Sequence, residues 1–204
     1  MKRSVIDPRK SYTFSDYFHL NPPVDELVAY FGYTHQVQAY PLPKKPVDTH
    51  FFASLHQELD DFLLYVDLTS EIARRETLIA PVLLNVARYL KVKVKIEYYL
   101  TVTEQLKGTL DYFLQNHDHF LLVEAKDENL QRGFTQLAAQ LIALDQWLEP
   151  GSDTLYGAVS IGNVWQFGLL QRQSKQVIQD LNLFRVPADL DELLQILVAI
   201  LDHT

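Results

Sequence analysis

Residues 108–126 have the sequence GTLDYFLQNHDHFLLVEAK. Two apolar stretches, 108–114 and 119–126, flank the polar residues 115–118, and this pattern predicts a β-hairpin. The second stretch is apolar on both faces until Glu124, so it is expected inside a sheet, where a charged group is costly unless it is paired. A carboxylate and a lysine at the end of such a strand indicate either a functional site or a structural ion pair.

Strand geometry predicts which charged side chains of this hairpin meet. Glu124 and Lys126 are two residues apart, so their side chains share one face of the strand. A turn with an even number of residues pairs Asp111 with Leu122 and sets Asp111 diagonally next to Glu124. An odd number would send Asp111 to the opposite face. The even register is the expectation, with two carboxylates and one ammonium group close together.

These three groups suit the chemistry of phosphodiester hydrolysis. Two close carboxylates repel each other unless a cation lies between them, and carboxylate oxygens are hard ligands that suit Mg²⁺ or Mn²⁺. The backbone carbonyl of Ala125 offers a further oxygen. The ammonium group of Lys126 can orient an attacking water or stabilise charge that develops on a phosphate.

The surrounding pattern predicts an α/β (α+β) domain with a small mixed sheet flanked by helices. Helical spacing runs from Thr69 or Ser70 towards Leu90, with a kink or break expected at Pro81. A strand follows at 91–98, then the hairpin and a helix at 129–148. A second hairpin, 155–161 and 164–171, and a helix at about 189–201 complete the order.

Residues 1–68 are expected to form an aromatic-rich lead-in packed on this core. It contains predicted helices near 24–31 and 52–65, joined by a proline-rich linker. With 204 residues, the chain is expected to form a single domain. The lead-in, a core at 69–171 and a C-terminal segment at 172–204 are its expected parts.

The composition excludes several classes of protein. The chain has no cysteine, which excludes disulfides, thiol nucleophiles and cysteine-based metal centres. No apolar run approaches the roughly 20 residues of a membrane span, and the N-terminus lacks the apolar stretch of a signal peptide. A cytoplasmic protein with no membrane partner is expected.

The charge distribution indicates one basic region in an acidic chain. The net charge is −8, whereas residues 71–107 carry an excess of basic side chains. Arg74, Arg75, Lys93 and Lys95 in this region are candidates for contacts with a nucleic-acid backbone. The alternatives are an ion pair between the arginines and Glu71 and, for the lysines, the solvated face of an edge strand.

The spacing from Asp111 to Glu124-x-Lys126, on a hairpin between two helices, resembles the PD-(D/E)XK nuclease superfamily, which has the restriction endonuclease-like fold. The resemblance covers about residues 69–171 and includes the form Gly108-x-x-Asp111. It implies a nuclease that uses Mg²⁺ or Mn²⁺ to cleave DNA. Asp111 and Glu124 would hold the metal, and Lys126 would act on the attacking water.

A narrower resemblance concerns the two helices that flank the hairpin. The sequence that begins Ser70-Glu71-x-x-Arg74 is similar to the N-terminal nuclease domain of type I restriction motor subunits, which implies that Glu71 is a third metal ligand. Glu76 is the second choice for that ligand. The helix after Lys126 carries Gln136 and resembles the glutamine-bearing helix beside such active sites.

A rival interpretation keeps the fold and drops the catalysis. A non-catalytic restriction endonuclease-like protein would bind a protein or a nucleic acid, and the overall acidity and the lead-in favour it. The complete Asp, Glu and Lys set favours the enzyme. The last helix carries an apolar stripe that is either core or a two-fold interface, and a homodimer is expected. The stripe consists of Leu190, Leu193, Leu194, Leu197, Ile200 and Leu201.

Overall fold

The computed structural model describes residues 6–126 and 129–202. Its elements in chain order are α1 (Phe14–Leu20), α2 (Val24–Tyr30), β1 (Thr34–Gln38), α3 (Thr49–Tyr65), α4 (Glu71–Arg74), the π-helical turn η1 (Arg75–Ile79), α5 (Ala80–Leu90), β2 (Lys93–Thr103), β3 (Leu106–Asn116), β4 (His119–Ala125), α6 (Leu130–Trp147), β5 (Thr154–Ser160), β6 (Val164–Gln171), β7 (Gln176–Arg185) and α7 (Leu190–Leu201). The predicted α/β class with a mixed sheet between helices is confirmed.

One seven-stranded sheet runs through the described part of the chain, in the order β1-β7-β6-β5-β4-β3-β2. Strands β2, β3 and β4 form an antiparallel meander. Helix α6 then crosses the sheet, and β5 pairs with β4 in parallel. Strands β6 and β7 continue antiparallel, and β1 adds to β7 in parallel.

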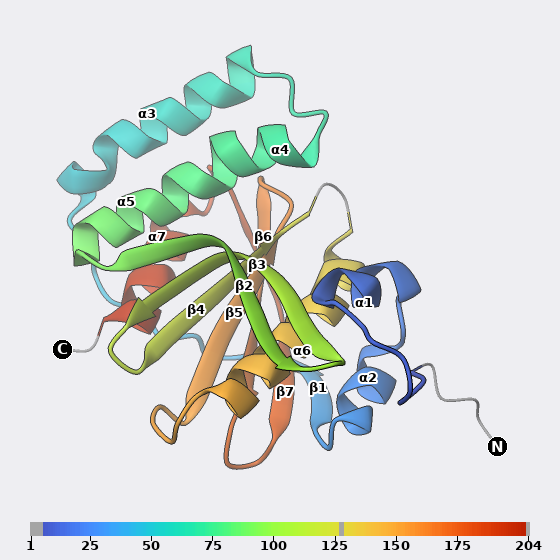
Figure 1. The fold of residues 1–204 in the computed structure, drawn as a ribbon. Helices are drawn as coiled ribbons and strands as arrows, with labels where there is room; N and C mark the ends of the chain where they lie inside the picture. Colours follow the sequence, from blue (N-terminus) through green and yellow to red (C-terminus); the bar gives the residue numbers. More distant parts are fainter. Residues whose placement is uncertain (1–5, 127–128, 203–204) are drawn as a thin grey trace.

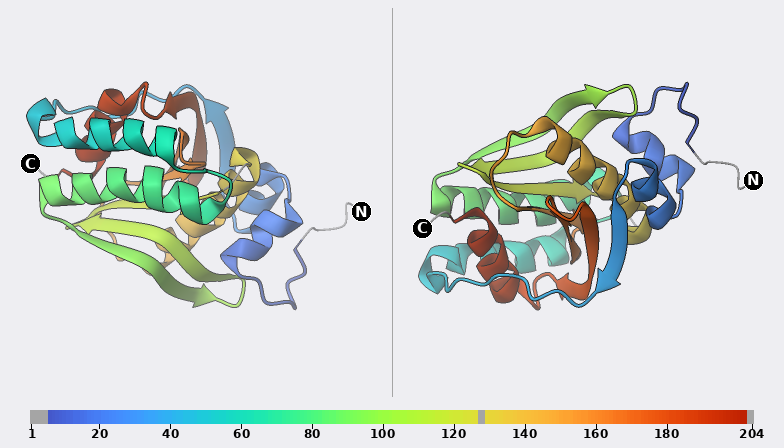
Figure 2. Two further views of the ribbon diagram at one scale, coloured as in Figure 1. Left: turned by 90° about the horizontal axis from the view of Figure 1, so that it is seen from above. Right: turned by 90° about the horizontal axis from the view of Figure 1, so that it is seen from below.

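Helices cover both faces of the sheet (Figures 1 and 2). Buried residues of α3, α5 and α7 form one apolar cluster, and those of α1, α2 and α6 form another on the opposite face. Burial of apolar area is the main favourable term in folding, so these two clusters hold the three layers together. We call the two sides of the sheet the α5 face and the α6 face.

The sheet contains strands from all three expected parts of the chain. Strand β1 comes from the lead-in and β7 from the C-terminal segment, and neither strand was expected. Helix α1 was also not expected. The predicted elements between residues 91 and 171 are all present, and none of their boundaries differs from the prediction by more than five residues.

The helix before the meander contains the expected irregularity, which ends at Ile79, two residues before Pro81. Pro81 lies in the first turn of α5, and the π turn Arg75–Ile79 precedes it. The amide of Ala80 donates to the carbonyl of Arg75, five residues back. Because Pro81 has no N–H to donate into the preceding turn, a wider turn is tolerated at this point.

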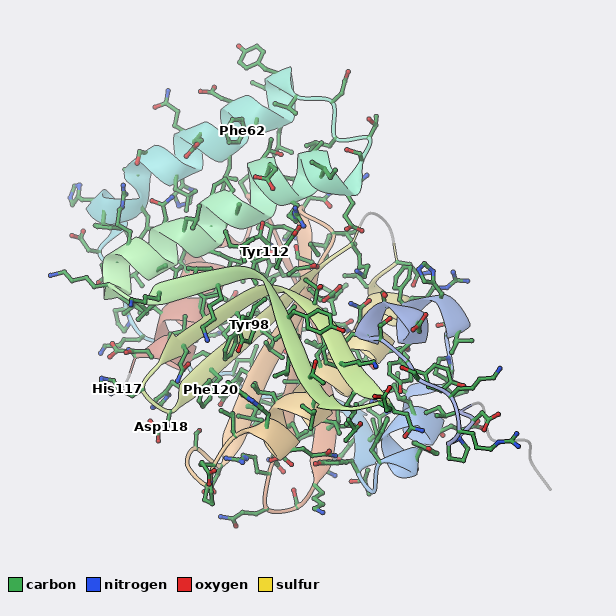
Figure 3. The ribbon with its side chains drawn as sticks, in the orientation of Figure 1. Phe62, Tyr98, Tyr112, His117, Asp118 and Phe120 are labelled. Atoms are coloured by element: carbon green, nitrogen blue, oxygen red, sulfur yellow. The ribbon has the colours of Figure 1, made fainter. Side chains whose placement is uncertain are left out.

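The meander bends sharply at Glu97, whose φ is +51°. Before the bend, Val94 and Tyr112 pack on the α5 face; beyond it, Tyr98 and Leu110 pack on the α6 face, as Figure 3 shows for the two tyrosines. The simple alternation expected for residues 91–98 is therefore wrong in part. Ile96, expected to be buried, is 51% exposed at the bend.

None of the described helices is long and apolar enough to cross a membrane. Helix α7 is buried along its length, and its apolar stripe packs against the sheet and α5. The stripe is therefore core, so it does not offer the two-fold interface that motivated the expected homodimer.

Candidate functional site

The hairpin β3–β4 has a two-residue turn, His117–Asp118, at the tip labelled in Figure 3. Asn116 pairs with His119 and Tyr112 pairs with Val123. The even turn length is confirmed, but the register differs by two residues from the expected one. One step beyond the last pair, Asp111 lies opposite Glu124 rather than opposite Leu122.

Asp111 and Glu124 come together at the end of the hairpin. The Oδ2 atom of Asp111 accepts a hydrogen bond from the backbone amide of Ala125 at 2.8 Å. This bond fixes the Asp111 carboxylate against the last residues of β4. The bend at Glu97 lies on the neighbouring strand at the same level, so Asp111 marks the point where the meander changes face.

Glu124 and Lys126 form a buried ion pair, with 2.5 Å between Nζ of Lys126 and Oε1 of Glu124. The residues are only 1% and 8% exposed. Lys126 also donates to the carbonyl of Ala125 at 2.9 Å, and its ammonium lies 5.1 Å from the ring centre of Phe18 in α1. Groups of β4 and an aromatic ring of the lead-in thus both contact the ammonium group of Lys126.

Helix α6 supplies two carboxamides to the same carboxylate. Gln136 donates to Oε1 of Glu124 at 2.6 Å, and Gln140, one turn later, donates to Oε2 at 2.5 Å. A Cβ atom at Gly133 would lie 2.5 Å from Val159 and 3.1 Å from Cγ of Lys126, so a glycine is needed where α6 approaches the sheet. We call Asp111, Glu124, Lys126, Gln136 and Gln140 the carboxylate–lysine cluster.

The two carboxylates strongly affect the protonation of this cluster. Burial, and after it the carboxylate of Asp111, raises the pKa of Glu124 to about 8, although Lys126 and Gln140 lower it. Burial lowers the pKa of Lys126, but Glu124 and Asp111 outweigh this effect and hold it above its ordinary value. The negative charge of Glu71 adds a smaller contribution to that rise in the pKa of Lys126.

The four predicted nucleic-acid contacts divide into two pairs. Arg74 donates to the carbonyls of Leu68 and Ile161, and Arg75 donates to Glu97 at 2.9 Å. Both arginines therefore bind groups of the protein itself.

The two lysines lie on the solvent side of β2, the last strand of the sheet. Lys93 and Lys95 are exposed, and the ammonium group of Lys95 lies 4.3 Å from the ring centre of Tyr98. This location fits the edge-strand alternative and also leaves both charges accessible to a nucleic acid.

The cluster offers hard oxygen ligands to a divalent cation. Among residues 6–126 and 129–202, no group of three or more histidine, aspartate or glutamate side chains is placed to hold a metal. Mg²⁺ is nevertheless commonly held by one or two carboxylates with water as its other ligands. Oε1 of Gln136 is buried and has no hydrogen-bond partner among the described residues. This unpaired oxygen, on the same side chain that donates to Glu124, fits a cation or its bound water.

Three contributors were not among the predicted site residues. The sequence shows Gln140 one helical turn after Gln136 and therefore on the same face, but only Gln136 was predicted as a site residue. Gly133 carries no such signal, since the need for a glycine arises only from the packing of α6 on β5. Phe18 belongs to the aromatic-rich lead-in, whose packing partner the sequence does not reveal.

Comparisons with family models, with curated proteins and with solved structures found no match to this chain.

Proposed function

We propose that the chain is a metal-dependent nuclease of the PD-(D/E)XK type that hydrolyses phosphodiester bonds in DNA. The observation that carries the proposal is the carboxylate–lysine cluster: a buried Glu124–Lys126 pair beside Asp111, at the end of a central hairpin. An ion pair this deeply buried is poor evidence for added stability, because desolvation offsets much of the attraction. A functional role accounts better for its cost.

The fold supports the same proposal. A helix, a three-stranded meander, a second helix and a parallel strand follow one another, and the predicted catalytic residues lie where the meander meets that second helix. Glu71, at the start of α4, adds a negative charge that helps to raise the pKa of Lys126. The arrangement brings distant parts of the chain to one end of β4.

Within this proposal, each side chain has a role. Asp111, Glu124 and the carbonyl of Ala125 would hold Mg²⁺ or Mn²⁺, with Glu71 assisting. The metal, when bound, would polarise a phosphoryl oxygen and acidify a water. Lys126 would place its positive charge beside the reacting phosphate, and Gln136 and Gln140 would hold the carboxylate of Glu124 in position.

A non-catalytic role remains the second candidate, and one observation favours it. Both oxygens of Glu124 already accept hydrogen bonds within the protein, from Lys126, Gln136 and Gln140. Such a satisfied network would also serve a protein that keeps the fold for binding alone. The arginines that bind protein groups are consistent with this candidate too.

A cleavage assay separates the two candidates. Linear, circular and single-stranded DNA are incubated with the purified protein in Mg²⁺, Mn²⁺ or EDTA. The nuclease proposal predicts cleavage with either metal, none in EDTA, and loss of cleavage in Asp111→Asn. Asp60→Asn, on the exposed face of α3, is the matched control and should cleave normally. Absence of cleavage under every condition would favour the non-catalytic candidate.

A further inference from the structure

A polar pocket opens on the α6 face, away from the carboxylate–lysine cluster. Its volume is about 460 Å³. Its lining combines three glutamine carboxamides, one imidazole, one carboxylate and several apolar side chains: Gln131, Gln166, Gln179, His35, Asp25, Pro23, Val24, Val37 and Leu181. We call it the glutamine pocket.

The register of the sheet connects the glutamine pocket to the cluster. Glu124 pairs with Val159, and Val159 pairs with Gln166, so the pocket wall lies two strands from the carboxylate. Neighbouring strands are about 4.8 Å apart, which gives a spacing of roughly 10 Å. Gln131 lies in the first turn of α6, the helix that also carries Gln136. The pocket therefore lies at the first turn of this helix and the cluster at its second and third turns.

The polar groups of the glutamine pocket are only partly satisfied. Gln179 is 5% exposed and donates to Oε1 of Gln166 at 3.3 Å, and Gln166 donates to the carbonyl of Asp180. Each carboxamide retains a further donor or acceptor position. Nε2 of His35 is buried and has no hydrogen-bond partner among the described residues. Buried polar atoms of this kind normally find a partner, so the pocket is suited to a ligand that supplies one.

The lining argues against a phosphate group as the ligand. It contains no lysine or arginine, and Asp25 adds a negative charge. Burial lowers the pKa of His35 and so favours the neutral imidazole, whereas Asp25 and Gln179 raise this pKa to a smaller extent. Carboxamides instead match the paired donor and acceptor atoms on the edge of a nucleobase. Val24, Val37 and Leu181 offer apolar surface for its ring.

We infer that the glutamine pocket binds a nucleobase of the substrate strand, a few nucleotides from the bond that is cut. This inference rests on the proposed function. At a rise of 3.4 Å per nucleotide, the spacing of roughly 10 Å corresponds to about three nucleotides of a stacked strand. The enzyme would then show a base preference at one position near its cleavage site.

The test measures binding without cleavage. A random single-stranded DNA library of about 12 nucleotides is equilibrated with the protein in EDTA, and the bound fraction is sequenced. We expect one position at which a base, or one class of base, is enriched about tenfold. Gln166→Leu and the exposed Gln131→Ala should each reduce that enrichment to about twofold or less. Gln36→Leu, an exposed glutamine of β1 outside the pocket, should retain it.

The outcomes separate this inference from the nuclease proposal. A protein that cleaves DNA but shows no base enrichment overturns the glutamine pocket as a base site and leaves the nuclease intact. Enrichment that depends on Gln131 and Gln166, without cleavage in any metal, supports the pocket and removes the catalytic role. A wild-type protein that retains no DNA overturns the inference. Enrichment unchanged in both pocket variants also overturns it.

Discussion

Protonation of Glu124 should make the free energy of unfolding depend on pH. It is buried, it receives three side-chain hydrogen bonds, and its pKa is raised to about 8 from an ordinary value of 4.5. The folded protein therefore holds a proton that the unfolded chain releases between these two pH values. By linkage, the free energy of unfolding falls as the pH rises through this window.

Glu124→Gln should remove this dependence, because an amide has no proton to lose. Between pH 5 and pH 8, the wild type should lose stability relative to the variant by up to about 1.4 kcal/mol per pH unit. Urea denaturation at a series of pH values measures the difference. Glu58→Gln, an exposed change on α3, should follow the wild type. Parallel curves for wild type and Glu124→Gln would show that Glu124 is ionised throughout.

At the scale of single residues, the sequence predicted the pairing of Asp111, Glu124 and Lys126 because strand parity is a local rule. The exact register was not predictable, since the polar residues 115–118 allow more than one even turn. The contacts from Phe18 and Gly133 depend on how α1 and α6 pack on the sheet. The pattern of neighbouring residues does not reveal how these two helices pack on the sheet.

At the scale of elements, the bend in β2 positions Asp111. Glu97 occupies the left-handed region at φ +51°, a conformation that β-branched side chains adopt only with strain. Arg75, from the π turn before α5, donates to the Glu97 carboxylate and holds the bend against the helical layer. The π turn before α5 and the bend in β2 are thus joined by this hydrogen bond, next to Asp111.

Replacing Glu97 tests the conformational part of this account. Glu97→Val and Glu97→Asn both remove the ion pair with Arg75, but asparagine tolerates the left-handed region and valine does not. Glu97→Val should be less stable than Glu97→Asn by about 1–2 kcal/mol in urea denaturation. Equal stability of the two variants would mean that the strand is not bent in this way.

The edge position of β2 leads to a prediction about binding. Lys93 and Lys95 are accessible, whereas Arg74 and Arg75 are engaged by the protein. Lys93→Gln with Lys95→Gln should weaken DNA binding and reduce the slope of log K against log salt by up to about 2, with single-turnover cleavage unchanged at saturation. Fluorescence anisotropy over a salt series measures the slope. Lys175→Gln is the control, and an unchanged slope in the double variant would remove β2 from the binding surface.

Two elements were missed for a reason that is visible in their residues. Strand β1 has the sequence THQVQ, with one apolar residue, and it pairs only with β7, about 140 residues away. Strand β7 carries Gln179 and Asp180 at buried positions, which interrupts the expected apolar pattern. The backbone groups of β1 bond to residues of β7 that are far away in the sequence. The pattern of neighbouring residues therefore gives little indication of either strand.

At the scale of the whole molecule, the described chain forms three layers in which the lead-in and the last helix are structural parts. The α/β class and the order of the central elements followed from hydrophobic periodicity. Hydrophobic periodicity could not show where the apolar stripe of α7 is buried, because such a helix face suits a core and a dimer interface equally well. In the structure, the stripe of α7 is buried against the sheet within one chain and is therefore part of the core.

Leu197→Ala distinguishes a core stripe from an interface in solution. Leu197 is fully buried within the chain, so the variant should lose about 2–5 kcal/mol of stability. The loss should be independent of protein concentration between the micromolar range and a hundredfold dilution, as measured by urea denaturation. A loss that depends on concentration would indicate that α7 is buried between subunits.

The role of Lys126 is the direct test of the proposed chemistry. Lys126→Met keeps an unbranched apolar stem but removes the ammonium group whose charge would lie beside the reacting phosphate. With Mg²⁺ and saturating enzyme, the single-turnover rate of DNA cleavage should fall by a factor of about 100 or more, while DNA affinity and folding are retained. The exposed Lys10→Met should cleave at the wild-type rate. A folded Lys126→Met protein that also cleaves DNA at the wild-type rate would contradict the assignment of the carboxylate–lysine cluster as the active site.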